Sequence, residues 1–359
     1  MTLFKPSSLI LCLIALLTPF TPSYALVVLQ YHHVSESTPN STSLSPDQFL
    51  EHMQLIEALQ LEVVDLESAT FALLNNDITA YKSNTDKQVA ITFDDAYDSI
   101  IENAHPELKR RNWPYTVFVN TKAVKQGHNG LMSWEQLQTL IDDGVTIANH
   151  SSTHAHLPSI PESMTLDQWL DSEVLDAQKE LEKRLTKVST MFAYPYGEFT
   201  LEMLPWFEKH GILAFGQQSG PIGPLSHPQA LSRFPAAGIY ANPETLKTKM
   251  LSLALPLSSS NLQEPLITPE NNPPKLVIDL IAADYDPKRI QCFASQQGAI
   301  DTKVEKTGDK ITLTAQASNP LTGARARYNC TVPSAQSGSY YWYSQPWQMG
   351  LSSDDNEGY

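Results

Sequence analysis

The sequence predicts an α/β fold built on parallel strands, followed by a small β domain. Across residues 25–255, short apolar runs alternate with amphipathic segments of helical spacing, which is the order of repeated βα units. Polar residues able to do chemistry follow several of the apolar runs directly. Residues 257–275 are rich in proline and serine, and short strand-like runs come after them. These observations indicate a barrel-like domain, a linker and a second domain.

The first 25 residues have the pattern of a signal peptide. Lys5 precedes an apolar run from Leu9 to Leu17, and Ser23-Tyr24-Ala25 is a small-x-small cleavage site. The run is short for a membrane span, and an uncleaved anchor is the alternative. We therefore expect an exported protein, periplasmic or secreted, with no transmembrane segment after signal removal.

The charge excludes one class of partner. The 359 residues carry a formal net charge of −15, and the pI is about 5.0. Because an acidic chain is poorly suited to neutralise phosphates, we expect no nucleic acid as a partner.

The elements of the first domain, residues 26–256, follow from hydrophobic pattern and capping residues. Ser45 and Ser133 each begin a capping box, with glutamine three residues later. Apolar, often β-branched runs predict strands at residues 25–34, 61–66, 89–93, 115–120, 145–148, 190–194, 212–215 and 231–236. Helical spacing predicts helices after Ser45 and after residue 66, and at residues 99–111, 133–144, 170–185, 201–210 and 243–253.

Two of the predicted strands lead into acids and histidines. Asp94 and Asp95 follow one strand, and neighbouring carboxylates are best tolerated where a cation or a proton relieves their repulsion. His150 and His154 follow another strand in the same way. One carboxylate and two imidazoles suit a divalent metal and leave coordination positions open. The second carboxylate would then lie beside the metal as a general base for water.

The candidate residues fall at one predicted face. The carboxyl ends of strands, where β/α barrels build their sites, carry His32, His33, Asp94, Asp95, His150 and Tyr196. We therefore expect one shared site. Because successive strand residues face opposite ways, only one of His32 and His33 can point into the barrel. Histidines on predicted helices or loops are expected at the surface: His52, His105, His128 and His210.

Three motifs in order carry a family resemblance. They are Thr92-Phe93-Asp94-Asp95, His150-Ser151-Ser152-Thr153-His154 and Phe192-Ala193-Tyr194-Pro195-Tyr196-Gly197. Together they resemble the polysaccharide deacetylase family, carbohydrate esterase family 4, over about residues 25–255. The Tyr31-His32-His33 opening is most similar to its poly-N-acetylglucosamine deacetylase branch. The resemblance implies a deformed (β/α)7 barrel and metal-dependent removal of acetyl groups from sugars.

The resemblance also implies roles for individual residues. Asp95, His150 and His154 would bind the metal, with His156 as the alternative to His154. Asp94 would be the base, and the backbone N–H of Tyr196 would help to stabilise the oxyanion. Zinc suits these ligands, while cobalt, nickel or manganese would also bind.

Two departures from the family pattern concern the charge beside the base and the general acid. Many members carry an arginine near the start of the third motif, where this chain has Ala193; Arg233 could supply that charge instead. Leu225-Ser226-His227 has the letters of the family's terminal Leu-x-His but lies among prolines, so we interpret it as a chance match. His32 or His33 is then the expected acid or site-shaping residue, with His32 taken as the catalytic candidate.

The second domain is expected at residues 276–348, with an acidic tail at 349–359. Cys292 and Cys330, the cysteines left after signal removal, predict a disulfide in an exported protein; two free thiols are the alternative. The aromatic cluster at residues 340–343 could stack on sugars, but the first expectation is that it forms the core of a small sheet or packs that sheet against a neighbour.

Taken together, the sequence predicts an exported metal-dependent deacetylase. It would hydrolyse N-acetyl groups of a polysaccharide containing N-acetylglucosamine, through a metal-activated water. Two alternatives are open: an esterase that removes O-acetyl groups from a polysaccharide such as xylan, and a catalytically silent glycan-binding protein.

Overall fold

A computed structural model describes residues 25–75, 87–258, 262–308, 310–335 and 338–350. The predicted signal segment up to Tyr24 and almost all of the acidic tail lie outside the described residues. Within the described part, no helix combines the length and the apolar character needed to cross a membrane.

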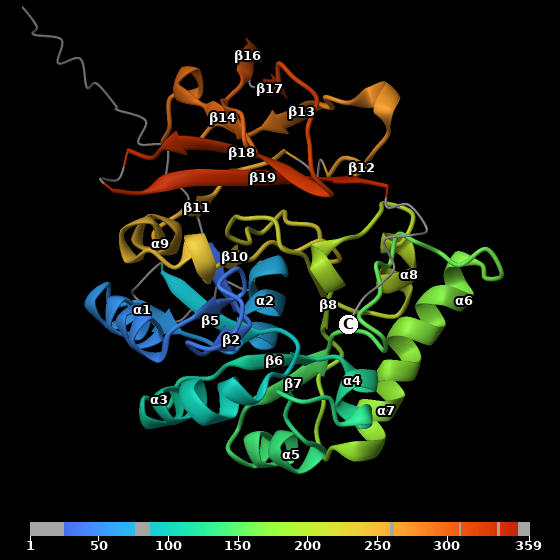
Figure 1. Ribbon diagram of the computed structural model, residues 1–359. Helices are drawn as coiled ribbons and strands as arrows, with labels where there is room; N and C mark the ends of the chain where they lie inside the picture. Colours follow the sequence, from blue (N-terminus) through green and yellow to red (C-terminus); the bar gives the residue numbers. More distant parts are fainter. Residues whose placement is uncertain (1–24, 76–86, 259–261, 309, 336–337, 351–359) are drawn as a thin grey trace, which may run out of the picture.

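The first domain is a parallel sheet curled into a half-barrel (Figure 1). Its strand order is β10-β1-β5-β6-β7-β8-β9, and β4 pairs with β5. The strands are β1 (Leu26–Tyr31), β4 (Glu62–Val63), β5 (Gln88–Phe93), β6 (Thr116–Val119), β7 (Thr146–Asn149), β8 (Phe192–Ala193), β9 (Ala214–Phe215) and β10 (Phe234–Pro235). A separate pair joins β2 (His33–Val34) to β3 (Ser43–Leu44). The predicted β/α barrel architecture is confirmed.

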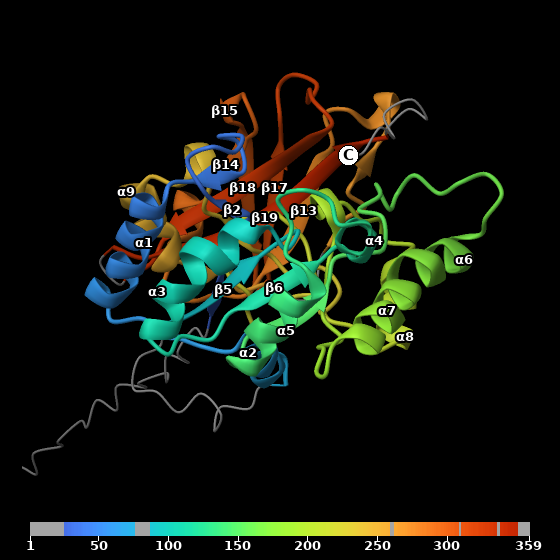
Figure 2. The ribbon, with the colours of Figure 1, turned by 60° about the horizontal axis from the view of Figure 1, so that its bottom comes forward.

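Helices cover the outside of this sheet, with α6 and α7 in one line at its β8 end (Figures 1 and 2). They are α1 (Pro46–Ala58), α2 (Leu66–Leu74), α3 (His105–Arg110), α4 (Thr121–Gln126), α5 (Trp134–Asp142), α6 (Leu166–Leu170), α7 (Asp176–Arg184), α8 (Leu204–Lys209) and α9 (Pro243–Met250). A π-turn, Asp171–Leu175, joins α6 to α7 and makes the long helix that the sequence predicts. Both predicted capping boxes, at Ser45 and Ser133, are present.

Two local predictions are wrong. The expected strand at residues 61–66 stops at Val63, because the Asp65 carboxylate accepts the N–H of Ser68 and starts α2 at Leu66. His52 and His105 are buried rather than exposed. His52 bonds to the Tyr31 hydroxyl and the Ala241 carbonyl, and His105 bonds to Tyr115 and Asp143. These hydrogen bonds offset the free-energy cost of burying the polar nitrogens of a histidine ring.

The strands after the half-barrel form two further β-sheets, called the β domain below, which include β11 and β12 from the predicted end of the first domain and the predicted linker. One is antiparallel, with order β13-β17-β16; the other has order β11-β19-β18-β14-β15, and β12 also pairs with β19. The strands are β11 (Leu253–Ala254), β12 (Leu266–Ile267), β13 (Lys275–Leu280), β14 (Gln291–Ala294), β15 (Gly298–Ala299), β16 (Asp301–Thr307), β17 (Lys310–Gln316), β18 (Arg325–Pro333) and β19 (Tyr340–Met349). The predicted disulfide between Cys292 and Cys330 is present and joins β14 to β18.

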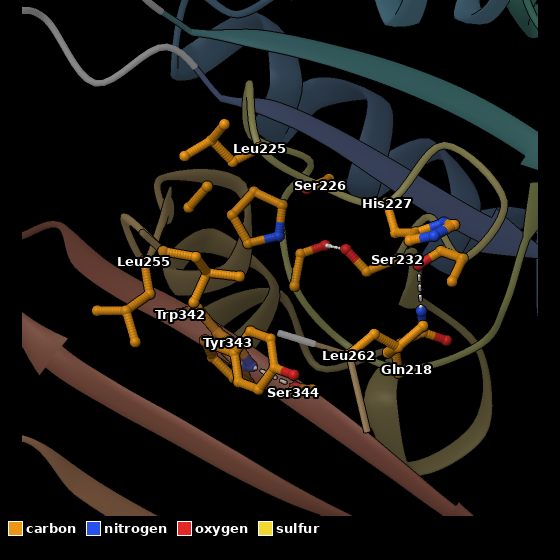
Figure 3. Close-up of a pocket in the computed structure, with 15 residues that line it drawn as sticks. Gln218, Leu225, Ser226, His227, Ser232, Leu255, Leu262, Trp342, Tyr343 and Ser344 are labelled. Carbon is orange, nitrogen blue, oxygen red and sulfur yellow. Dashed lines mark hydrogen bonds between the residues drawn. The ribbon is translucent and has the colours of Figure 1, made fainter. Parts of the chain in front are cut away.

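The sheet that contains β18 and β19 lies against the half-barrel (Figure 1). Trp342 of β19 packs edge-to-face on Phe234 of β10, with ring centroids 5.3 Å apart. A small pocket at this joint is lined by the loop around residues 218–232 and by β19, and His227 lies at its rim with Trp342 and Tyr343 opposite (Figure 3). Within the aromatic cluster, Trp342 therefore packs against the half-barrel and Tyr341 is buried in the core of the β sheets, while Tyr340 is exposed.

Candidate active site

Backbone strain is concentrated where the predicted site residues lie. Within the described residues, eight non-glycine residues have a left-handed φ between 53° and 72°. Five of the eight are at this site: Asp95, Ala96, Ser151, His154 and Tyr196. A non-glycine residue in this region costs of the order of 1 kcal/mol or more, and such residues gather at functional sites.

Asp95, His150 and His154 form one buried group. A possible ligand atom from each lies within 4.8 Å of the other two. Asp95 Oδ1 is 3.4 Å from Nε2 of His150 and 3.3 Å from Nε2 of His154. The group comes from the turns after β5 and β7, the two strands that flank β6 in the sheet. The topology therefore assembles the carboxylate and both imidazoles that the sequence predicts as ligands.

The protonation of this group suits a metal. The Nδ1 of His150 donates to the Ala193 carbonyl at 2.8 Å, so its Nε2 carries the lone pair. Among the described atoms, this buried Nε2 has no hydrogen-bond partner. A bound metal ion would coordinate its lone pair. Burial lowers the pKa of both His150 and His154 from 6.5 to about 4. Both imidazoles are therefore neutral at pH 7, as ligation requires.

Asp94, beside this group, forms a fully buried ion pair with Arg233. Arg233 donates Nη1 to Oδ1 at 2.7 Å and Nη2 to Oδ2 at 2.8 Å, and Gln30 donates Nε2 to Oδ2 at 2.7 Å. Burial acts to raise the pKa of Asp94, but the Arg233 charge, His150 and the Arg233 hydrogen bonds outweigh it and hold that pKa well below its ordinary value. The Asp94 carboxylate is therefore ionised at neutral pH.

Arg233 is itself held by the sheet. It lies just before β10, donates Nε to the Gly216 carbonyl at 3.0 Å and donates Nη1 to the Thr92 hydroxyl at 3.2 Å. Ala193, the position where many family members have arginine, contributes its carbonyl to His150 instead. The geometry places the Arg233 charge against Asp94, where the sequence hypothesis needed a cation.

The two neighbouring histidines face different surroundings. Nε2 of His32 is 4.0 Å from Asp94 Oδ2, and the His32 side chain is 18% exposed. His33 is buried and stacks on Tyr97, with ring centroids 3.5 Å apart. His32 therefore reaches the site and solvent, while His33 packs beside it.

Tyr196 lies in a tight turn next to the buried group of Asp95, His150 and His154. Its ring contacts that of His154 at 4.6 Å. The turn is closed by the Gly197 N–H, which donates to the Tyr194 carbonyl at 2.8 Å. Gly197 has φ +74°, and a Cβ there would lie 2.6 Å from the Gln217 backbone nitrogen. Only glycine fits that position, so the turn holds the Tyr196 backbone closely.

Three further residues belong to the site and were missed. Gln30 is a polar residue within an apolar strand run. A buried polar side chain needs a hydrogen-bond partner, and here that partner is Asp94. Glu198 directly follows the third motif and accepts a hydrogen bond from His156 at 2.7 Å. Arg325, from β18, contacts Tyr196, and nothing in the sequence around it predicts that. His227, in contrast, lies at the interdomain pocket (Figure 3).

Comparisons with known proteins point to one family. Residues 81–215 match the sequence profile of the family described as polysaccharide deacetylase. The chain is 28% identical over 216 residues to YxkH of Bacillus subtilis (strain 168), a candidate polysaccharide deacetylase, covering 60% of this chain and 69% of that protein. It is 27% identical over 155 residues to a poly-beta-1,6-N-acetyl-D-glucosamine N-deacetylase of Staphylococcus aureus (strain MRSA252), covering 41% of this chain but only 53% of that protein.

Solved structures share the fold of the first domain. The Streptococcus pyogenes deacetylase PplD, in complex with acetate, aligns with a TM-score of 0.56 and 22% identity, covering 64% of this chain and 99% of that chain. IcaB from Ammonifex degensii aligns with a TM-score of 0.52 and 21% identity, covering 63% and 97%. The structural alignments support the half-barrel fold. At these sequence identities they do not assign a role to any residue of this chain.

Proposed function

We propose, because residues 81–215 match the profile of the polysaccharide deacetylase family, that this protein is a metal-dependent hydrolase that removes N-acetyl groups from a polysaccharide containing N-acetylglucosamine. The observation that carries the proposal is the buried Asp95, His150 and His154 group next to the ionised Asp94. The activity named for the Staphylococcus aureus relative supports the choice of polymer.

The proposed ligands are Asp95, His150 and His154, with zinc as the preferred metal and cobalt, nickel or manganese as alternatives. The orphaned Nε2 of His150 and the neutral imidazoles support this assignment. When bound, a divalent metal would lower the pKa of a water molecule and polarise the acetyl carbonyl.

The chain's own residues would then divide the proton transfers. Asp94, ionised and oriented by Arg233 and Gln30, would accept a proton as the water oxygen attacks the acetyl carbon. The Tyr196 N–H would donate to the oxyanion. His32, 4.0 Å from Asp94, would give a proton to the amine nitrogen as the C–N bond breaks. Acetate and a free amino sugar are the products.

The site of action is proposed from the sequence. Residues 1–25 have the signal-peptide pattern, so we propose that the protein is exported and meets an acetylated polysaccharide in the periplasm or outside the cell.

Acetate release by the mature protein tests the function. N-acetylglucosamine oligomers and, in separate reactions, O-acetylated xylan are incubated with metal-free and zinc-reloaded protein. The same reactions are run with two variants, Asp94→Asn and the surface control Asp47→Asn. We expect release that requires zinc, that Asp94→Asn abolishes and that Asp47→Asn keeps. Release only from O-acetylated xylan would identify an esterase instead. A protein that binds zinc but releases acetate from neither polymer would contradict the proposal and favour a silent glycan-binding protein.

A further inference from the structure

The second domain reaches into the turn that carries Tyr196. Arg325, on β18, donates Nη1 to the Tyr196 carbonyl at 3.2 Å. Its guanidinium also lies over the Tyr196 ring, 5.1 Å from the centroid, a distance at which cation–π attraction operates. The Arg325 Nε is 3.8 Å from Glu198 Oε1. One side chain of the β domain thus contacts both the backbone and the ring of a residue next to His154.

Two half-barrel residues complete the contacts around Tyr196. His156 stacks on the Tyr196 ring, with centroids 4.0 Å apart and planes within 8° of parallel. The His156 Nδ1 is bonded to Glu198 Oε2 at 2.7 Å, and Glu198 is only 3% exposed. Glu198 therefore links the histidine to the arginine. We call His156, Glu198 and Arg325 the Tyr196 clamp.

The conformation of Tyr196 explains why a clamp is needed. Its φ is +59°, a region that disfavours every residue with a Cβ. A strained residue keeps such a conformation only where its surroundings over-determine it. The Gly197 hydrogen bond closes the turn from one side, and the Arg325 hydrogen bond holds the Tyr196 carbonyl from the other. Loss of Arg325 removes one of the restraints on the orientation of the backbone at Tyr196.

The same strand is anchored to the half-barrel next to this point. Arg327, two residues along β18, donates to the Ser219 hydroxyl at 3.1 Å and to the Tyr240 hydroxyl at 2.7 Å. Gln348 of β19 donates to the Phe199 carbonyl at 2.8 Å. These contacts seat the β domain on the loops that flank the Tyr196 turn, and they involve no atom of Tyr196 itself.

We propose that Arg325 is a positioning residue for the deacetylation reaction and that the C-terminal β domain is therefore part of the active site. Arg325 acts through Tyr196: it holds the turn so that the Tyr196 N–H keeps the direction in which it meets the developing oxyanion. This inference rests on the proposed function for its effect on rate, but not for its effect on the turn.

Variants at two arginines of the same strand test the inference. Arg325→Met removes the contacts with Tyr196, Arg325→Lys keeps a donor and a charge, and Arg327→Met removes only the neighbouring anchor. The readouts are kcat and KM for N-acetylglucosamine oligomers, zinc content, and amide hydrogen exchange of the peptide that covers residues 194–201.

For Arg325→Met we expect kcat about tenfold lower with KM changed less than about twofold, unchanged zinc content, and faster exchange in residues 194–201. Arg325→Lys should recover most of the lost kcat. Arg327→Met should leave kcat and this exchange near the wild-type values. An unchanged kcat in Arg325→Met, or an equal loss of kcat in Arg327→Met, would overturn the inference.

Hydrogen exchange separates this inference from the proposed function. If the wild-type protein releases no acetate, the proposed function fails, and exchange alone decides about Arg325. Faster exchange of residues 194–201 in Arg325→Met but not in Arg327→Met then still supports the clamp. Equal exchange in all three proteins overturns it.

Discussion

Arg233 and Asp94 form a bidentate ion pair although both side chains are fully buried and 139 residues separate them in sequence. The parallel pairing of β1 with both β5 and β10 brings the two residues together. A buried pair is costly to break, because the remaining partner is left as an uncompensated charge.

We predict that Arg233→Met lowers the free energy of unfolding by about 3–5 kcal/mol. Turnover should fall as well, since Asp94 loses the Arg233 charge and two of the three side-chain donors that orient it. Zinc content should change little, because Arg233 contacts none of the three proposed ligands in the described contacts. Urea unfolding, initial rates and elemental analysis check these effects. The double variant Asp94→Asn, Arg233→Met should lose less free energy of unfolding than the two single variants lose together. Strictly additive losses would contradict the coupling of the pair.

The proposed ligand set predicts one zinc per chain. Asp95→Asn and His154→Gln should lose most of the bound zinc, because each removes one of three ligands. His156→Gln is the matched control: the buried group comprises Asp95, His150 and His154, while the His156 ring stacks on Tyr196 outside it, so the variant should keep zinc. Elemental analysis after dialysis against a weak chelator measures the content. Retention in His154→Gln with loss in His156→Gln would reverse the assignment of these two histidines.

His32 and His33 predict opposite effects on rate and stability. His32→Gln should lower kcat by about 10²-fold or more, since it removes the proposed proton donor, and should change stability little. His33→Gln removes the buried stack on Tyr97, so the variant should be less stable while most of its turnover remains. Rates and urea unfolding of both variants, loaded with zinc, make the comparison. An unchanged kcat in His32→Gln would exclude His32 as the general acid.

The buried histidines predict a pH dependence of stability. Burial lowers the pKa of His33, His150 and His154 from 6.5 to about 4. Between these values the unfolded chain binds protons that the folded chain does not, so the metal-free protein should lose stability as the pH falls from 6.5 towards 4. Asp94, whose pKa is lowered from 3.8, loses its contribution only below that window.

Urea unfolding of chelator-treated protein at pH 7, 6, 5 and 4.5 measures this dependence. The His150→Gln variant should show a shallower slope, because one of the histidines whose pKa is lowered by burial is removed. A free energy of unfolding that stays constant over this range would contradict the buried, neutral state of these imidazoles.

The sequence by itself determined the features that depend on near neighbours. The capping boxes at Ser45 and Ser133, the strand that ends at Phe93 and the order of the three motifs needed only local pattern. Where two local signals competed, as at residues 61–66, the Asp65 cap prevailed over the apolar run. The disulfide was also predictable, because the third cysteine, Cys12, lies in the predicted signal segment.

Tertiary structure alone decided which distant side chains meet. Gln30 reaches Asp94 because β1 pairs with β5 in one register, and a shift of one residue would turn Gln30 to the other face of the sheet. Arg233 meets Asp94 through the pairing of β10 with β1, and Arg325 meets Tyr196 through the docking of a second domain. Register and docking are set by the packing of the whole chain, so no local sequence pattern records them.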